Sequence, residues 1–333
     1  MTHRIATIPG DGIGQEVIPA AVDVLRATGL PFEFAPAEAG WQTFQRRGTA
    51  LPAETLGLVR ECGLALFGAV SSPARRVEGY RSPIVALRRE LDLYANLRPA
   101  LSPPIAGARP GVDLLLVREN TEGLYAGRER RQGDGAVAER VITRRASERI
   151  GRLACQLALA RRRHLTIVHK ANILPETCGL FRDCVRAQAA DFPGLRVEEC
   201  LVDTMALRLV LTPEAFDVVV TTNLFGDVLS DEAAALVGGL GLAPAANIGP
   251  QAAVFEPVHG SAPDIAGKGI ANPVAAILAA AMLLEHVGEG SAAQRVRRAV
   301  WHTLQHGPRT PDLGGTATTA EVVRGVLGVM RDA

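Results

Sequence analysis

Two aspartates four residues apart, Asp227 and Asp231, are the first candidates for chemistry in this sequence of 333 residues. They follow a β-branched run at residues 217–222 that is typical of a buried strand, and on a helix their carboxylates would share one face. Two like charges held so close repel each other unless a cation lies between them. A hard divalent ion with oxygen ligands would relieve this repulsion, and Asp203 could supply a third carboxylate. By itself, the spacing more often belongs to a solvated helix face.

Three arginines are candidates for binding an anionic substrate. Arg118 ends an apolar run at residues 114–117, Arg98 precedes a proline, and Arg88 lies in a helical segment. A guanidinium at the end of a buried strand must find an anion or water, because its unpaired burial is costly. Three converging guanidiniums would bind a dicarboxylate through paired hydrogen bonds. For each arginine alone, a structural salt bridge explains the residue as well.

Lys170 and Tyr125 are candidates for proton transfer. Lys170 follows the expected strand at residues 165–169. Near other cations or out of water its pKa would fall from about 10.4 toward neutrality, which would fit it to accept a proton. Tyr125 precedes an exposed segment and could donate one. A lysine that extends its charge into water and a tyrosine that packs in an interface are the alternatives.

Glycines at positions 10, 12 and 14 lie between the first expected strand and the helix that follows. This spacing suggests a dinucleotide site, but the third glycine of the G-x-G-x-x-G fingerprint is missing and no acidic residue occupies a clear ribose-binding position. A tight turn that needs positive φ explains the glycines equally well. The glycines therefore do not predict a Rossmann fold.

The composition limits the classes of protein. Hydrophobic residues make up 47% and charged residues 21%, which is ordinary for a soluble globular enzyme. A net charge of +1 argues against nucleic acid as a partner. The longest apolar stretch, residues 274–284, is too short to span a membrane. Five scattered cysteines suit a reducing cytoplasm, and the chain starts almost directly in a strand, so we expect no signal peptide and a cytoplasmic location.

Strand-like and helical segments alternate, which predicts α/β layers. The expected strands are residues 4–8, 32–34, 64–70, 114–117 and 165–169, and the clearest expected helices are residues 15–27 and 82–93. Charged alternating segments around Gly133-Asp134-Gly135 predict an exposed hairpin between residues 122 and 146. An isolated hairpin is marginal in water, so we expect it to pack against something, such as a second subunit.

Six motifs together resemble the β-decarboxylating dehydrogenases, the family of isocitrate, homoisocitrate, 3-isopropylmalate and tartrate dehydrogenases. They are residues 10–14, 97–99, 118–125, 169–172, 223–231 and 256–267, and the resemblance runs in unbroken motif order from residue 4 to about residue 330. Within the family, Trp41 with Phe44, residues 91–96 and residues 307–315 look most like homoisocitrate dehydrogenase.

The fold that this resemblance implies is α/β, with an open mixed sheet in two domains, helices on both faces and a protruding dimerisation hairpin at residues 124–146. It is not a Rossmann fold. Residues 1–98 and 238–333 would form a discontinuous cofactor-binding domain, and residues 99–237 a substrate and dimerisation domain.

The resemblance also implies roles for the candidate residues. The metal carboxylates for Mg²⁺ or Mn²⁺ would be Asp203, Asp227 and Asp231, and the catalytic pair Tyr125 and Lys170. The substrate would be bound by Arg88, Arg98, Arg118, Arg81, Ser82, Val85 and Asn172. In such enzymes Lys170 and Asp203 reach the active site from the partner subunit, which implies a homodimer or tetramer with shared active sites.

An NAD site is implied along the turns of the cofactor-binding domain. Its residues would be Ile13, Ser71, Ser72, Glu256, His259, Gly260, Ser261, Ala262, Asp264, Ile265 and Asn272. A carboxylate at Asp264 accepts hydrogen bonds from the ribose hydroxyls and repels a 2′-phosphate. NADP-dependent relatives carry a lysine and a tyrosine where this sequence has Asp264 and Ile265, so NAD is the expected cofactor.

The substrate side-chain pocket is expected to combine a polar lip, Arg81 and Ser82, with an apolar wall, Ile84 and Val85. Such a pocket would accept homoisocitrate and isocitrate and tolerate 3-isopropylmalate, because an apolar contact discriminates by only about 1–3 kcal/mol per methylene. The expected reaction is the conversion of homoisocitrate to 2-oxoadipate in lysine biosynthesis. A 3-isopropylmalate dehydrogenase of leucine biosynthesis is the alternative, and a non-catalytic regulatory subunit is a minor one.

Overall fold

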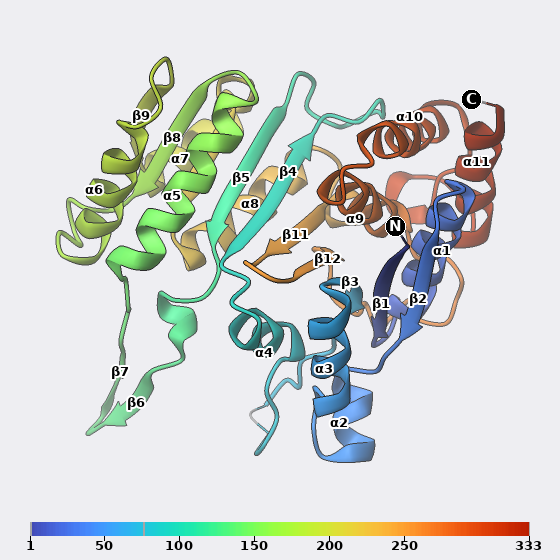
Figure 1. Cartoon of the computed structure of the whole chain (residues 1–333), viewed down its shortest axis with the longest axis horizontal. Helices are drawn as coiled ribbons and strands as arrows, with labels where there is room; N and C mark the ends of the chain where they lie inside the picture. The colour runs from blue at the N-terminus through green and yellow to red at the C-terminus, as the bar shows by residue number, and fades with distance from the viewer. Residues whose placement is uncertain (1, 76, 333) are drawn as a thin grey trace. The chain divides into compact units, whose positions relative to one another are not determined.

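The computed structural model describes residues 2–75 and 77–332, which fold into two compact units (Figure 1). Unit 1 comprises Met1–Asp92, Pro103–Ala108 and Gly238–Ala333, and unit 2 comprises Leu93–Ser102 and Arg109–Val237. The division differs from the predicted domain ranges at residues 93–98 and 103–108. Residues 93–98 belong with unit 2 because β4 (Ala95–Leu101) pairs antiparallel with β5 (Asp113–Glu119) along its whole length.

The sheet of unit 1 has the strand order β2-β1-β3-β12-β11. Its strands pair in parallel except for β11 and β12, which are antiparallel. The bounds are β1 (His3–Gly10), β2 (Phe32–Pro36), β3 (Leu64–Ala69), β11 (Pro244–Ile248) and β12 (Ala253–Pro257). β3 is buried on both faces, which explains its continuous apolar sequence.

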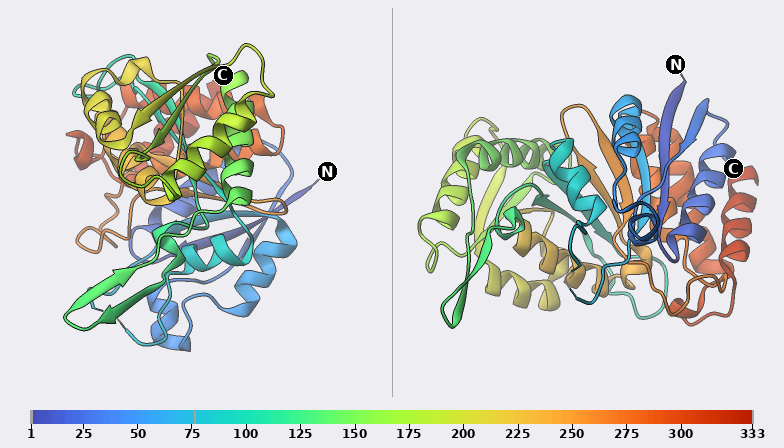
Figure 2. Two further views of the ribbon diagram at one scale, coloured as in Figure 1. Left: turned by 90° about the vertical axis from the view of Figure 1, so that its left-hand side faces the viewer. Right: turned by 90° about the horizontal axis from the view of Figure 1, so that it is seen from below.

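Helices cover both faces of this sheet (Figure 2). On one face lie α1 (Gly14–Ala27), α9 (Val274–His286), α10 (Gly290–His306) and α11 (Thr319–Asp332), and α3 (Ala53–Cys62) lies against β1 and β3 on the other. The short helices α2 (Trp41–Arg47) and α4 (Pro83–Glu90) precede and follow α3 and β3, and η3 (Leu240–Leu242) and η4 (Pro311–Leu313) are 3₁₀ turns. α9 is apolar nearly all round and buried, as a central core helix should be.

The sheet of unit 2 has the order β4-β5-β10-β8-β9, with β10 (Val218–Thr221), β8 (His164–His169) and β9 (Arg196–Leu201) parallel to β5. α5 (Arg144–Leu159) and α6 (Thr177–Ala189) pack on one face of it. α7 (Val202–Leu211), η2 (Pro213–Ala215) and α8 (Asn223–Leu236) lie on the other, as Figures 1 and 2 show. The predicted α/β class, with a mixed sheet and helices on both faces, is confirmed.

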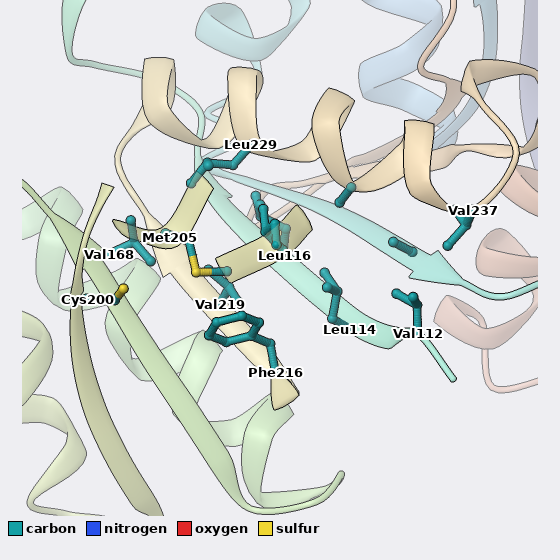
Figure 3. Close-up of a cluster of buried hydrophobic side chains, with 13 residues drawn as sticks. Val112, Leu114, Leu116, Val168, Cys200, Met205, Phe216, Val219, Leu229 and Val237 are labelled. Atoms are coloured by element: carbon teal, nitrogen blue, oxygen red, sulfur yellow. The ribbon is translucent and has the colours of Figure 1, made fainter. Parts of the chain in front are cut away.

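A buried apolar cluster fixes α8 on the sheet of unit 2 (Figure 3). Leu229 and Ala233 of α8 face this cluster, and Leu116, Val219 and their neighbours on the strands receive them. Asp227 and Asp231 are each two residues before these apolar positions, so helical geometry turns both carboxylates away from the core. The predicted strand, helix and shared face of the two aspartates are therefore present.

The predicted hairpin is also present, as β6 (Glu129–Gln132) and β7 (Gly135–Ala138) after the 3₁₀ turn η1 (Leu124–Ala126). Every residue of β6 and β7 is exposed, and Figures 1 and 2 show the hairpin projecting from the rest of unit 2. Gly133 has a φ of 60° in the turn, which a residue without a side chain adopts easily. Its packing against a second subunit stays a prediction.

The helix predicted at residues 82–93 is shorter, because α4 ends at Glu90 and Asp92 turns the chain with a φ of 47°. Ser82 occupies the N-cap position but its side chain makes no capping hydrogen bond, so Pro83 supplies the start signal. Within residues 2–75 and 77–332, no helix is long and apolar enough to cross a membrane.

Candidate functional site

The carboxylate of Asp227 is the centre of the first cluster of predicted site residues. It accepts hydrogen bonds from the guanidinium of Arg118 and from the phenol of Tyr125. The guanidinium of Arg98 lies 3.2 Å from its Oδ1. These groups come from β5, η1, β4 and α8, so the fold brings together four of the predicted residues from distant parts of the sequence.

Arg98 connects the two aspartates of α8. Its Nη1 donates to Asp231 Oδ1 at 3.3 Å and to Ser230 Oγ at 2.7 Å, and its Nε donates to Asn96 Oδ1 at 2.6 Å. One guanidinium therefore bridges carboxylates one helical turn apart, which reduces their repulsion in the absence of a metal ion. Asp231 remains half exposed, with 54% of its side chain accessible, and is open to a further ligand.

Local sequence makes room for Arg118, which is only 1% exposed. A Cβ on Gly226 would lie 2.7 Å from Arg118 Cγ, so a glycine is required where the arginine stem crosses α8. Asn223, at the start of α8, accepts from Arg118 Nε at 3.0 Å and from Nη2 at 2.7 Å. Residues 223–227 thus provide the space and the hydrogen-bond acceptors that the buried side chain of Arg118 needs.

Tyr125 remains a proton donor in this environment. Burial raises the pKa of its phenol, and the hydrogen bond to Asp227 and the negative charge of Asp227 raise it further, against the opposing effect of Arg118. Burial likewise raises the pKa of Asp231, with the charge of Asp227 adding to this and the two arginines opposing it. The phenol is protonated at neutral pH at its ordinary pKa of about 10, and the upward shift keeps the proton on it.

Lys170 and Asp203 form a second cluster at the carboxyl ends of β8 and β9. These strands are parallel and His169 is opposite Leu201, so the residues that follow them emerge at the same edge. Lys170 Nζ donates to Asp203 Oδ1, and this hydrogen bond is the largest cause of the lowered pKa of Asp203. Asp203 is 62% exposed, so the pair is accessible.

The residues fit a divalent cation in chemistry but do not enclose one within a single chain. Asp203, Asp227 and Asp231 are hard oxygen donors of the kind that Mg²⁺ and Mn²⁺ prefer. Among the residues that the structure describes, no three His, Cys, Asp or Glu side chains gather as a metal site. The third carboxylate of the predicted set is therefore not brought to the other two by this chain's own fold.

Arg88, the remaining predicted arginine, is buried in unit 1 beside Glu256 of β12. Its Nη2 donates to Glu256 Oε1 at 3.0 Å and its Nε donates to Asn247 Oδ1 at 3.0 Å. Asn247 also donates to Glu256 Oε1 at 2.8 Å. The contact explains why an arginine is stable inside this unit, and it connects a predicted substrate residue to a predicted cofactor residue.

A cavity of about 340 Å³ in unit 1 brings together five of the predicted cofactor residues. It is lined by Ile13, Gly241, His259, Asp264, Ile265, Ile270, Asn272, Pro311 and Asp312. Asn272 Nδ2 donates to Asp312 Oδ2 at 2.9 Å, which fixes the amide. Asp264 is exposed at this cavity, where its carboxylate is free to accept hydrogen bonds from a ribose.

The hydrogen bonding of the His259 ring bears on whether a nucleotide fits this cavity. Its Nδ1 lies 3.0 Å from the carbonyl oxygen of Gly260, which can only accept, so the neutral ring carries its proton on Nδ1. Its Nε2 is buried and has no hydrogen-bond partner among the described residues. Burial is the main cause of a lowered pKa, which favours the neutral ring. An unpaired buried acceptor is suited to a donor such as an adenine amino group.

Asp11 is a residue that sequence reasoning missed. It is almost completely buried, and its carboxylate accepts from the backbone N–H groups of Trp41, Gln42 and Ser71 at 2.7–3.0 Å. Ser71 Oγ then donates to Ser261 Oγ at 2.7 Å. The acidic residue between Gly10 and Gly12 was the available signal, because a carboxylate in a tight buried turn needs backbone donors.

The other predicted residues lie in exposed or partly exposed positions. Ser72, Gly260, Arg81 and Asn172 are exposed, and Ala262, Ser82 and Val85 are partly exposed. Ala262 has a φ of 40° and its carbonyl accepts from the backbone N–H groups of Ile265 and Ala266, which shapes the predicted cofactor loop. Ile84, by contrast, is buried among the residues of unit 1, so Val85 is the accessible part of the predicted apolar wall.

The chain is similar to known dehydrogenases over nearly its whole length. The family model described as isocitrate/isopropylmalate dehydrogenase matches residues 4–326. The chain is 61% identical to the isocitrate/homoisocitrate dehydrogenase of Thermus thermophilus and 50% identical to a 3-isopropylmalate dehydrogenase of Archaeoglobus fulgidus, each over at least 98% of both chains. It also resembles the crystal structure of an isocitrate dehydrogenase from Methylococcus capsulatus, with a TM-score of 0.95, 47% identity and 99% coverage of both chains.

A family match over nearly the whole chain, relatives of high identity and a solved structure of the same fold all point the same way. The predicted open mixed sheet and the resemblance read from the six motifs are thereby confirmed. The chain belongs to the isocitrate/isopropylmalate dehydrogenase family, whose members are β-decarboxylating dehydrogenases.

Proposed function

We propose that this protein uses NAD and Mg²⁺ or Mn²⁺ to oxidise and decarboxylate homoisocitrate, giving 2-oxoadipate, and that it also accepts isocitrate. The observation that carries the proposal is the cluster around Asp227, in which one carboxylate meets Arg98, Arg118 and Tyr125. Cationic donors for substrate carboxylates, oxygen ligands for a metal ion and a protonated phenol are then present in one place. A protein that binds the substrate without turnover has no need of the protonated phenol.

Arg98 and Arg118 bind the carboxylates of the malate core, and Arg88 of unit 1 contributes a third guanidinium. Charge-assisted contacts between arginine and carboxylate are strong and directional, so they fix the orientation of C2 and C3. When the arginines take up substrate, Asp227 and Asp231 become available as metal ligands. These carboxylates would hold Mg²⁺ or Mn²⁺, which would supply Lewis acidity for the oxidation and the decarboxylation.

Lys170, in its neutral form, takes the proton from the C2 hydroxyl. NAD⁺ held by the cofactor residues of unit 1 would supply the hydride acceptor. The 2-oxo acid that results carries a carboxylate β to its ketone, and this carboxylate leaves as CO₂. Tyr125 then gives its proton to C3 of the enol. A tyrosine phenol carries its proton at neutral pH, so the proton is present for this step.

Unit 1 holds NAD through the cavity beside His259 and Asn272. The unpaired Nε2 of His259 supports recognition of the adenine, and Asp264 supports NAD over NADP because its charge repels a 2′-phosphate. The hydrogen bond between Ser71 and Ser261 holds the two predicted cofactor loops together.

Homoisocitrate and isocitrate are favoured because Arg81 and Ser82 precede α4 in accessible positions, where they can meet a distal carboxylate. A relative named for both substrates is 61% identical to this chain, which supports the same choice. The second candidate is 3-isopropylmalate, the acid named for a relative that is 50% identical. The accessible and apolar Val85 favours it.

A second copy of the chain completes the proposed site, in a homodimer or tetramer. Asp203 lies at the start of α7, and α7 packs against α8, so we propose the exposed apolar side chains of these two helices as the interface. They are Leu207, Val210, Leu211, Leu224 and Val228, each at least 36% exposed. Exposed apolar groups of this kind mark protein interfaces, and a symmetric dimer would deliver Lys170 and Asp203 of one copy to Asp227 of the other.

The direct test is the formation of NADH by the purified protein, followed by absorbance with Mg²⁺ and each of the three acids. We expect the largest kcat/KM with homoisocitrate, measurable turnover of isocitrate, and no activity in EDTA. Turnover of 3-isopropylmalate alone would reject the polar-lip argument. Absence of turnover with all three would favour the regulatory-subunit alternative.

The shared site is tested by mixing two inactive variants, Lys170→Met and Asp227→Asn, by co-expression. In a mixed symmetric dimer one site carries both substitutions and the other carries neither, so roughly a quarter of wild-type activity should return. If the mixture stays as inactive as its components, each chain contains its own complete site.

We also propose a cytoplasmic location, to which the five free cysteines are suited.

A further inference from the structure

The imidazole of His169 ends β8 immediately before Lys170. Its Nδ1 accepts a hydrogen bond from the backbone N–H of Ala171 at 3.1 Å, and its Nε2 lies 3.2 Å from Glu199 Oε2 on β9. A backbone N–H can only donate, so Nδ1 must carry a lone pair. The proton of the neutral ring is therefore on Nε2, where it is donated to the carboxylate of Glu199. The two partners select one tautomer.

The hydrogen bond from Ala171 closes the start of a turn. Backbone N–H groups of Ile173 and Leu174 donate to the carbonyl oxygen of Lys170, at 3.1 and 2.8 Å, which shapes the rest of the turn. The N–H of Ala171 takes no part in these bonds and goes to His169 instead. Since His169 is 5% exposed, the acceptor is held rigidly inside unit 2. Without it, an N–H at this position would have to find another partner.

The second contact of the imidazole ring, with the carboxylate of Glu199, fixes the ring from its other side. Glu199 uses Oε2 for the imidazole and Oε1 for the guanidinium of Arg186, at 2.5 Å, so both of its oxygens are engaged. His169 is opposite Leu201 in the pairing of β8 with β9, which places Glu199 two residues earlier on the neighbouring strand. The ring is thus held between a strand partner on one side and its own turn on the other.

We infer that His169 is a positioning residue for Lys170, because its Nδ1 fixes the turn from which the lysine side chain departs. The inference rests on the proposed function, in which Lys170 accepts the proton of the substrate hydroxyl. A displacement of about 1 Å in such a group is enough to lower a rate by about a hundredfold. Among the residues that the structure describes, Asp203 is the side chain that Lys170 contacts through a hydrogen bond, so the placement of Lys170 depends largely on the backbone turn.

The electrostatic surroundings keep this acceptor available. Burial is the first cause of a lowered pKa at His169, while the hydrogen bond and the charge of Glu199 act in the opposite direction. From α6, Arg182 lowers the pKa and Asp183 raises it. A neutral ring retains the lone pair on Nδ1, and a protonated ring would present an N–H to another N–H.

Two substitutions separate positioning from simple packing. In His169→Asn, the short side chain can accept the N–H of the residue two positions later, as asparagine does in Asx turns, although it leaves space in the core. His169→Leu fills the space but has no acceptor. We expect kcat for the best substrate to fall roughly ten- to a hundredfold in His169→Leu and by only a few-fold in His169→Asn, with KM changed little in both.

His164→Leu is the matched control, because His164 lies 3.5 Å from Glu198 and stands at the opposite end of the same strand from the turn. We expect it to retain wild-type kcat. If packing is what matters, His169→Leu will be more active than His169→Asn, and that ranking overturns the inference. An equal loss in His164→Leu would also overturn it.

An activity-independent measurement tests the tautomer. Long-range ¹H–¹⁵N spectra of wild-type protein labelled at histidine should show His169 protonated at Nε2 alone at neutral pH, with the His169→Asn spectrum giving the assignment. A proton on Nδ1 of His169 would overturn the inference even if His169→Leu does not fold. If wild-type protein turns over none of the three acids, the proposed function fails while the spectrum still decides the geometry of the turn.

Discussion

The two clusters of unit 2 differ in how far one chain completes them. Around Asp227, two guanidiniums and a phenol surround a carboxylate that is only 30% exposed, and Gly226 and Asn223 shape α8 to admit one of the arginines. Around Asp203, a single ammonium group meets a carboxylate that is 62% exposed. The first cluster is held by many contacts within its own chain, whereas the second is held by the turn that follows β8.

This difference separates a binding platform from a reactive pair. Buried and multiply bonded charges hold their geometry at the cost of mobility, and their loss affects the fold. Exposed pairs contribute little to stability, so they are free to serve a partner or a substrate. We therefore expect substitutions in the Lys170–Asp203 pair to change activity without changing stability, and substitutions around Asp227 to change both.

Lys170→Met should give the largest effect on activity. Removal of a general base typically costs a factor of about 10²–10⁴ in rate, so kcat should fall by that amount, measured as NADH formation at saturating substrate and NAD. The urea midpoint of unfolding should stay close to the wild-type value, because the carboxylate of the lost ion pair is largely exposed and methionine keeps the apolar stem of the lysine. A variant that kept full turnover would remove Lys170 from the proposed chemistry.

Arg118→Ala should give the largest effect on stability. It removes two hydrogen bonds to Asn223 and one to Asp227, and it leaves a gap beside Gly226. We expect a loss of about 2–4 kcal/mol, below the full cost of breaking a buried ion pair because Asp227 is partly solvated and keeps Arg98. Urea unfolding by circular dichroism measures it.

Arg46→Ala is the control for that experiment, since Arg46 forms an exposed ion pair with Glu38 in unit 1. It should change the free energy of unfolding by less than about 1 kcal/mol. Equal losses in the two variants would mean that the Asp227 cluster has no special stability, and the contrast between the clusters would disappear.

Glu122→Gln should give a smaller effect that depends on pH. Glu122 accepts from the backbone N–H and the hydroxyl of Thr143, at 2.8 and 2.9 Å, and so joins the two ends of the exposed hairpin next to Tyr125. Burial is the first cause that raises its pKa above the ordinary value of 4.5. The protonated form is thus favoured by folding.

The folded protein binds the proton of Glu122 more tightly than the unfolded chain does, so the free energy of unfolding depends on pH. Below the unfolded pKa Glu122 is protonated in both states, and stability is lost as the pH rises through the unfolded and then the folded pKa. Wild-type protein should therefore lose stability relative to Glu122→Gln as the pH rises above about 4.5, by about 1.4 kcal/mol for each unit of pKa elevation. Denaturant titrations of both proteins at several pH values give the difference. A constant difference would mean that Glu122 does not titrate differently on folding.

Local pattern was enough to predict the site elements of unit 2. The helical spacing of Asp227 and Asp231, the strand before them and the turn at Gly133 depend on neighbours in sequence, and all are present. The motif resemblance added the family and the roles of residues that spacing alone left open between structural and functional interpretations. The exposed hairpin was predicted because its charged alternation has no buried face.

Contacts between distant residues were not predictable in the same way. Arg88 donates hydrogen bonds to Asn247 and Glu256, which are 159 and 168 residues away in the sequence. Nothing in the sequence around Arg88 identifies these partners. The unit that residues 93–98 join depends on such a contact as well, because β4 belongs with unit 2 through its pairing with β5.

The carboxylate of Asp11 has a consequence for the order of folding. Its hydrogen bonds span 30 to 60 residues, and the Ser71–Ser261 bond that extends them spans 190. Contacts of such long range form late, because they require the intervening chain to be organised first. On refolding, far-UV helicity should therefore return before the capacity to bind nucleotide, and added NAD should stabilise the last species to appear.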